Sequence, residues 1–151
     1  MKIYISASLV NHLQNARIAE SLEKSGHEVF LPQRFCPTNV PKNEYPLTIF
    51  EKCLEAMKDC DLGILVLDCY GKDSSWESGW FFGTQKPLIG FVQVCLKLSQ
   101  DWMVKGGLKG LITTDQSIKN FFIKDEMISH VPIIFIDTLN TIGKELGNFI
   151  I

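Results

Sequence analysis

One glutamate, Glu77, combines a reactive side chain with a position that could expose it. It lies between two tryptophans in DSSWESGWFFGTQ, three residues after Ser74. This spacing is typical of a capping box, in which a serine and a glutamate exchange hydrogen bonds with backbone amides at the start of a helix. A carboxylate in the first helical turn is also kept ionised by the helix amides and can attack a sugar carbon. Two interpretations stay open, a structural cap and a catalytic carboxylate.

The segments around Glu77 alternate between strand and helix patterns. Apolar or β-branched runs predict strands at residues 2–6, 27–32, 61–68, 87–92 and 131–137, with helical spacing in between and after the last. Residues 61–68, DLGILVLD, suit a strand covered on both faces of a parallel sheet. Residues 93–131 break the rhythm, with a flexible turn at GGLKG and a helix expected within 115–128.

This order predicts an α/β fold, a single doubly wound domain over residues 1–151 of the flavodoxin-like or Rossmann-like kind, with a five-stranded, mostly parallel sheet. Ligands of such sheets bind at the carboxyl ends of strands, where the winding direction switches. The candidate segments there are 6–9, 32–46 and 68–77. The sequence has no dinucleotide glycine fingerprint and no phosphate-binding P-loop, so we expect a site without a cofactor.

Charge and composition limit the classes of partner and of site that we expect. A formal net charge of −2 with no lysine or arginine run argues against nucleic acid, and no apolar run reaches the ~20 residues that cross a bilayer. The five cysteines contain no C-x-x-C pair and fall mostly in apolar segments, which indicates reduced thiols and a cytoplasmic location. The three histidines lie far apart without metal-ligand spacing, so we expect no metal site.

Four segments together carry a resemblance to a known family. KIYISASL, ESLEKSGHEVFLP, CLEAMKDCDLGILVLD and SSWESGWFFGTQKPLIGF resemble, in this order, the nucleoside 2-deoxyribosyltransferase family over residues 2 to about 92. The resemblance implies an enzyme that acts on the N-glycosidic bond of a small-molecule nucleoside or nucleotide, with Glu77 as the nucleophile. It also implies a homo-oligomer, a dimer or larger, in which a neighbouring chain completes each pocket.

The resemblance suggests roles for further residues. Tyr4, at the family's tyrosine position, would orient Glu77 or the sugar, although an ordinary strand residue would explain it equally well. Ser6 and Ser8 would offer hydroxyls to the sugar or to a 5′ group, and turn chemistry is their alternative. Ser74 would line the same site beside the nucleophile. Asn120 is the candidate for the residue that enters a neighbour's pocket.

Two departures from the family bear on the reaction. The family's aspartate on the second helix is replaced by Cys53, and the aspartate six residues before the nucleophile by Gly71. Asp68 and Asp73 are close enough in sequence to substitute. A thiol donates a proton poorly to a leaving base, so base exchange should suffer. A nicotinamide leaving group needs no proton, which keeps an NAD glycohydrolase of TIR type as an alternative, beside a non-catalytic nucleotide-binding module.

Overall fold

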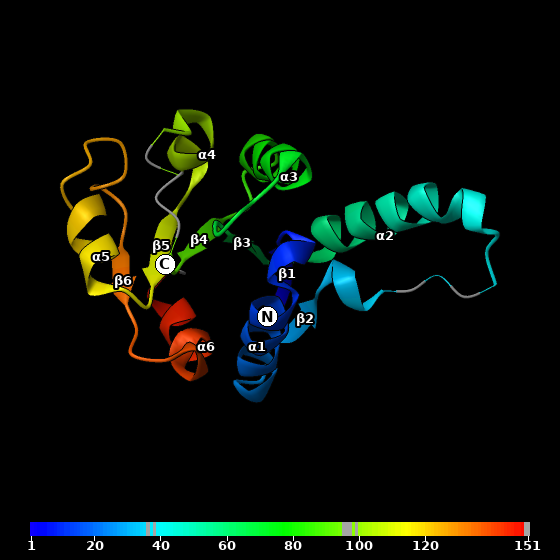
Figure 1. Ribbon diagram of the computed structural model, residues 1–151, viewed down its shortest axis with the longest axis horizontal. Helices are drawn as coiled ribbons and strands as arrows, with labels where there is room; N and C mark the ends of the chain where they lie inside the picture. Colours follow the sequence, from blue (N-terminus) through cyan, green and yellow to red (C-terminus); the bar gives the residue numbers. More distant parts are fainter. Residues whose placement is uncertain (36, 38, 95–97, 99, 150–151) are drawn as a thin grey trace.

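The chain folds around one parallel sheet. The computed structural model describes residues 1–35, 37, 39–94, 98 and 100–149. Its strands are β1 (Lys2–Ser6), β2 (Glu28–Phe30), β3 (Leu62–Val66), β4 (Leu88–Val92), β5 (Gly110–Thr113) and β6 (Ile133–Phe135). They lie in the order β2-β1-β3-β4-β5-β6, and all five neighbouring pairs are parallel (Figure 1). The predicted doubly wound α/β fold is confirmed, and the winding direction switches between β1 and β3.

The prediction of five strands was wrong by one. The missed strand is β5, whose four residues GLIT lie directly after the glycine-rich turn that we expected at residues 106–110. A strand this short shows no alternation, and a glycine at its start weakens the strand pattern further. Gly110 is nevertheless required, because a Cβ there would lie 2.1 Å from the ring of Phe149.

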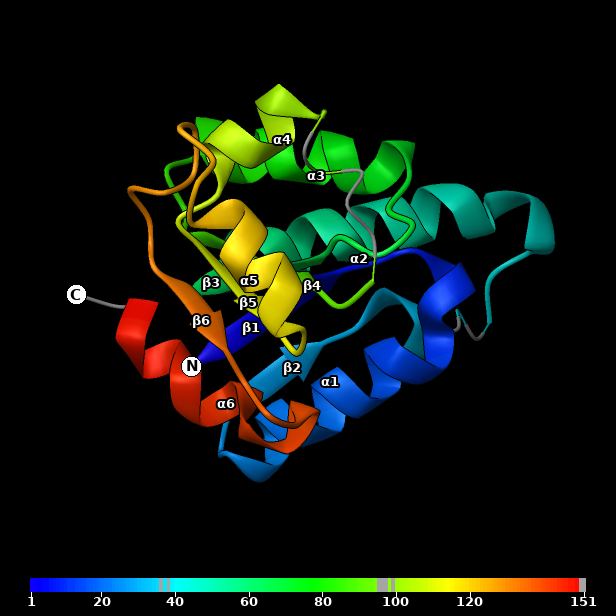
Figure 2. The same ribbon diagram turned by 60° about the vertical axis from the view of Figure 1, so that its left-hand side comes forward.

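Helices cover both faces of the sheet (Figure 1, Figure 2). Their bounds are α1 (His12–Lys24), α2 (Tyr45–Asp59), α3 (Lys72–Gly83), α4 (Trp102–Gly107), α5 (Gln116–Phe122) and α6 (Ile142–Glu145). Apolar side chains of α1 and α6 form one core layer with one side of the strands, and those of α2 to α5 form the other layer with the opposite side. Every residue of β3 and β4 is buried, as expected for central parallel strands.

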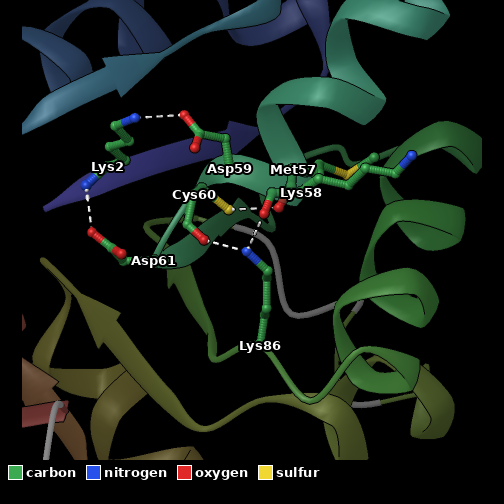
Figure 3. A network of polar contacts seen from close by, with 7 residues as sticks. All are labelled: Lys2, Met57, Lys58, Asp59, Cys60, Asp61 and Lys86. Carbon is green, nitrogen blue, oxygen red and sulfur yellow. Dashed lines mark hydrogen bonds and ion pairs between the residues drawn. The ribbon is translucent and has the colours of Figure 1, made fainter.

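A polar network anchors the carboxyl end of α2 to the amino ends of the strands (Figure 3). Lys86, just before β4, donates through Nζ to the carbonyl oxygens of Lys58, at 2.6 Å, and of Cys60. The backbone amide of Lys2 donates to Asp61 at 2.7 Å. A lysine at this end satisfies helix carbonyls that have no partner within the helix. The carboxyl half of α2 is thereby fixed beside β1 and β3, whereas its amino half projects away from the sheet (Figure 1).

Gly63 sets how closely α3 approaches the sheet. It stands opposite Tyr4 in the register of β1 and β3, and a Cβ there would meet the ring of Phe81 at 2.6 Å. The Phe81 ring, fully buried, therefore rests where a side chain of β3 would otherwise be. The Tyr4 ring stacks on Phe30 at 5.7 Å on its other side, so the aromatic packing holds both Tyr4 and α3 in place.

Replacing Gly63 by alanine should force α3 away from the sheet. Overpacking of this kind lowers the free energy of unfolding by about 1–3 kcal/mol. Gly79 is the matched control. It lies on α3, the helix that packs on Gly63, and a Cβ added there would have no atom within 4 Å. Gly79→Ala should raise the free energy of unfolding by up to about 1 kcal/mol, since alanine is the better helix former. Urea unfolding of the two variants checks this; equal stability of the two would contradict the packing described here.

Candidate active site

Glu77 lies on α3 and faces the first strand. Tyr4 donates through its hydroxyl to Oε1 of Glu77 at 2.5 Å, and the Ser6 hydroxyl donates to Oε2. Tyr4 and Ser6 are two residues apart on β1, so their side chains project from the same face of the strand. Both are almost completely buried. Two hydroxyls of one strand therefore hold the two oxygens of one carboxylate, beside the switch point between β1 and β3.

The capping-box interpretation of Ser74 and Glu77 was wrong. Helix α3 begins at Lys72, its N-cap is Gly71, and no side chain caps it. Ser74 is buried inside the first turn, and Glu77 falls in the second turn. The influence of the helix amides fades within the first turn, so they are not what holds this carboxylate. Its hydrogen bonds go to Tyr4 and Ser6 instead.

Burial and hydrogen bonding act on Glu77 in opposite directions. Burial raises the pKa of its carboxyl above the ordinary value, and the charge of Asp73 adds to the rise. The hydrogen bonds from Ser6 and Tyr4 favour the ionised form and offset part of it. Burial also raises the pKa of Tyr4, as does the neighbouring charge of Glu77, so the phenol keeps its proton and remains a donor.

A cavity of about 450 Å³ opens beside Glu77, between α2 and the start of α3. The rings of Phe50 and Trp76 both line it and lie close together, with their centroids 6.1 Å apart. The described residues that line it are Pro46, Ile49, Phe50, Cys53, Met57, Asp73, Trp76 and Glu77. A larger cavity of about 710 Å³ lies under α2, lined by Lys2 and Glu28 among others, and does not include Glu77. We assign the site to the smaller cavity, because ligands of this fold bind at the carboxyl ends of the strands.

Cys53 lies in the cavity wall, half-buried on α2. Burial raises the pKa of its thiol, and the charge of Glu77 acts in the same direction, whereas a hydrogen bond with the Tyr4 hydroxyl opposes them. The thiol is therefore protonated at neutral pH and close to the Tyr4–Glu77 pair. The structure thus brings together Tyr4, Ser6, Cys53, Asp73 and Glu77 from β1, α2 and α3.

Asp68 is buried at the end of β3, but it does not line this cavity. Its carboxylate accepts from the backbone amides of Gln93 and Val94, both at 2.9 Å, and from the side chain of Gln14 at 3.2 Å. These bonds tie the exits of β3 and β4 to α1. The geometry supports a structural role for Asp68, on the opposite side of the strand ends from α2.

The other predicted site residues lie farther from Glu77. Ser8 caps the short 3-10 turn Leu9–Asn11, where its hydroxyl accepts from the amide of Val10. Asn120 is exposed on α5, which packs against β5 and β6, and it accepts from Gln116 at 2.9 Å. Within one chain Asn120 therefore lies away from Glu77, and its place in a neighbour's pocket stays a prediction.

Sequence reasoning missed Phe50 as a site residue. It belongs to the apolar stripe of α2, which is the usual pattern of a core-facing helix. In the structure Phe50 and Trp76 are each about half exposed, at 49% and 52%, because the amino half of α2 does not rest on the sheet. A stripe pattern cannot distinguish a core face from a cavity wall, so only the course of the helix shows the difference.

Two kinds of site find no support in the described residues. They contain no group of three histidine, cysteine, aspartate or glutamate side chains placed to bind a metal ion. Nor does any helix within the described ranges have both the length and the apolar character needed to cross a membrane.

Tyr4, Ser6 and Glu77 all lie in a part of the chain that matches a known family. The family model of the nucleoside 2-deoxyribosyltransferases matches residues 3–121. The chain belongs to this family. The match extends past residue 92, the end of the segments that carry the resemblance, and reaches α5. No curated protein matches the chain by sequence.

Solved structures share the fold of this family member at low sequence identity. A 2-deoxyribosyltransferase from Bacillus psychrosaccharolyticus has a TM-score of 0.61 at 22% identity over 74% of this chain and 85% of its own. A conserved protein from Enterococcus faecalis has a TM-score of 0.58 at 14% identity over 99% of each chain. The CMP N-glycosidase BcmB of Clostridium botulinum has a TM-score of 0.51 at 17% identity over 98% and 99% of the two chains.

The hydroxyl donors should control the protonation of Glu77. Tyr4→Phe and Ser6→Ala each remove a donor to the ionised carboxylate, so each should raise the pKa of Glu77 further above its ordinary value. Ser75→Ala is the control, because this exposed serine of α3 bonds to the Gly71 carbonyl and not to Glu77. NMR titration of the glutamate side-chain carbons measures the effect. A Glu77 pKa unchanged in both β1 variants would show that these hydroxyls do not hold the carboxylate.

Proposed function

We propose that this protein cleaves or transfers at the N-glycosidic bond of a nucleoside or nucleotide, with Glu77 as the nucleophile. The observation that carries the proposal is a half-buried carboxylate, held by two hydroxyl donors, that borders an open cavity at the switch point of the sheet. Membership of the nucleoside 2-deoxyribosyltransferase family supports it. The names of two structural neighbours, a 2-deoxyribosyltransferase and a CMP N-glycosidase, point to the same bond.

The reaction we propose proceeds in two displacements. An oxygen of Glu77 adds to the anomeric carbon through an oxocarbenium-like transition state, the bond to the base breaks, and a glycosyl ester remains on the enzyme. Water or an acceptor base then opens the ester from the other side, so the configuration is retained. A carboxylate oxygen can accept more than one hydrogen bond, so donation by Tyr4 or Ser6 leaves a lone pair for the attack.

Tyr4 acts in this proposal as a positioning residue. Its hydroxyl bonds to Oε1 and its ring is clamped between Phe30 and Phe81, so the carboxylate is held in one orientation. Asp73 enters the cavity one helical turn before Glu77 and is placed to accept hydrogen bonds from sugar hydroxyls. Asp73 is exposed in the first turn of α3, so its side-chain oxygens are accessible to such a ligand.

We further propose that the protein works as a homodimer or a larger oligomer. Three aromatic side chains of α2 and α3 are largely exposed, namely Phe50 at 49%, Trp76 at 52% and Phe82 at 63%. Residues of these two helices also line the cavity. Aromatic surface of this extent on neighbouring elements is typical of an interaction site. A second copy seated there would complete the mouth of the cavity.

Light scattering at micromolar concentration should therefore give a mass of at least twice 17.1 kDa. Phe82→Glu should dissociate the assembly, since it places a charge in an apolar contact. Glu126→Gln, an exposed change in the turn after α5, serves as the control for surface charge. A monomer at this concentration would contradict the assembly.

Glu77→Gln should abolish base release, because an amide cannot form the glycosyl ester. The expected loss is at least ~10³-fold in kcat, the order seen when a nucleophile is removed. The fold should survive. Since burial raises the folded-state pKa of Glu77, the native protein loses stability as the pH rises from the ordinary glutamate value through the raised one. A neutral amide escapes this loss, so the thermal midpoint at pH 7 should stay level or rise.

Chromatography measures the release of free base from deoxynucleosides, ribonucleotides and NAD. Each substrate is assayed with and without an acceptor base. Calorimetry checks the fold. A variant that unfolds at a lower temperature and keeps its turnover would overturn the assignment, since Glu77 would then be a structural residue only.

A further inference from the structure

The walls of the Glu77 cavity carry negative charge and no positive charge. Two of its eight described lining residues, Asp73 and Glu77, are acidic, and none is a lysine, an arginine or a histidine. The pocket therefore offers no partner to an anionic group, such as a phosphate placed inside it. A cation in the same place would meet two carboxylates in a partly water-excluded space, where opposite charges attract more strongly.

Aromatic faces occupy the same cavity. Phe50 from α2 and Trp76 from α3 line it, with their centroids 6.1 Å apart and their planes tilted by 57°. Half of each side chain is exposed, so ring surface is free for a ligand. The face of an aromatic ring attracts a cation, and tryptophan does so most strongly. Two rings and two carboxylates, three of these groups on α3 and one on α2, thus favour the same kind of ligand, a flat cationic ring.

The cavity also lacks a suitable acid for a neutral leaving base. Glu77 must be ionised to attack, Asp73 is assigned to the sugar hydroxyls, and the Tyr4 hydroxyl is bonded to Glu77. That leaves the Cys53 thiol, whose proton is retained by burial and by the nearby carboxylate. A neutral purine or pyrimidine leaves as an anion unless it is protonated, so this site provides little help to its departure.

We infer that the preferred substrates are N-glycosides whose base is already a cation, such as a pyridinium or an N7-alkylated purine. The inference rests on the proposed function and names its substrate class. When Glu77 attacks the anomeric carbon, the electron pair of the breaking C–N bond neutralises the ring, and the base departs neutral with no proton needed. Water then replaces Glu77 on the sugar, and its surplus proton passes to the solvent. Hydrolysis of a cationic substrate thus releases one proton per turnover.

A binding measurement tests the recognition without any reaction. Nicotinamide and N1-methylnicotinamide share a ring, but only the methylated compound is a cation. Calorimetric titration should show the cation binding about tenfold more tightly to the wild type. The preference should fall in Trp76→Leu and in Asp73→Asn. Trp102→Leu is the matched control, because this tryptophan is exposed on α4 and does not line the cavity. Equal affinity for the two compounds would overturn the inference.

A turnover measurement uses a second matched pair, guanosine and 7-methylguanosine, assayed below neutral pH, where the methylated base keeps its charge. Both the ribosides and the 2′-deoxyribosides should be compared. After division by the uncatalysed rates, kcat/KM should favour the methylated substrate by at least about tenfold. Cys53→Asp, which adds an acid, should raise guanosine cleavage by about 10²-fold and leave 7-methylguanosine cleavage nearly unchanged.

The outcomes separate this inference from the proposed function. Base release that depends on Glu77 but shows no preference for the cationic member of either pair would overturn the inference and leave the proposed function standing. A cation preference in binding without base release from any substrate would overturn the proposed function, while the cation site itself would stand. If Cys53→Asp fails to fold, the binding measurement still tests the inference, because it does not use that variant.

Discussion

The structure depends on the burial of one carboxylate. Glu77 projects from α3 toward β1 and is half-buried there, and a carboxylate that loses part of its water needs hydrogen-bond donors in its place. Tyr4 and Ser6 supply them, one to each oxygen. This requirement fixes how near α3 must come to the first strand, and the fold meets it with Gly63, whose missing side chain lets Phe81 pack directly against the sheet. The hydrogen bonds from Tyr4 and Ser6 to Glu77 therefore require α3 to pack close to the central strands.

The same burial links stability to reactivity. Partial burial raises the pKa of the Glu77 carboxyl, and the hydrogen bonds from Ser6 and Tyr4 oppose that rise by favouring the ionised form that the proposed attack requires. Placing an ionised group in a partly buried position costs stability, and such a cost is common at functional sites. The anchoring of α2 by Lys86 serves the same end, because it fixes the cavity wall that bears Cys53. The amino half of α2 is not anchored in this way, and its aromatic face remains open.

Much of this architecture could be predicted from the sequence, for definable reasons. The long apolar run of β3 and the helical stripe of α2 are strong patterns, and the resemblance to the nucleoside 2-deoxyribosyltransferases brought Tyr4, Ser6 and Glu77 together before any coordinates. Strand β5 escaped because its four residues, which begin with a glycine, are too few to show a periodicity. The capping box was wrong because spacing does not tell where a helix begins, and α3 begins before Ser74. The role of Phe50 and the contacts of Asp68 depend on how elements lie in space, which no local pattern records.

The proposed nucleophilic role of Glu77 requires a covalent bond between its carboxylate and the sugar, and that bond can be trapped. A substrate with fluorine at the 2′ position slows the opening of the ester more than its formation, because the fluorine destabilises the oxocarbenium-like transition state of both steps while a good leaving base still drives the first. Mass spectrometry of the quenched protein should then show a gain equal to one sugar, located by peptide mapping on the segment that contains Glu77. Base release from the unmodified substrate with no such adduct, or an adduct on another residue, would contradict the account.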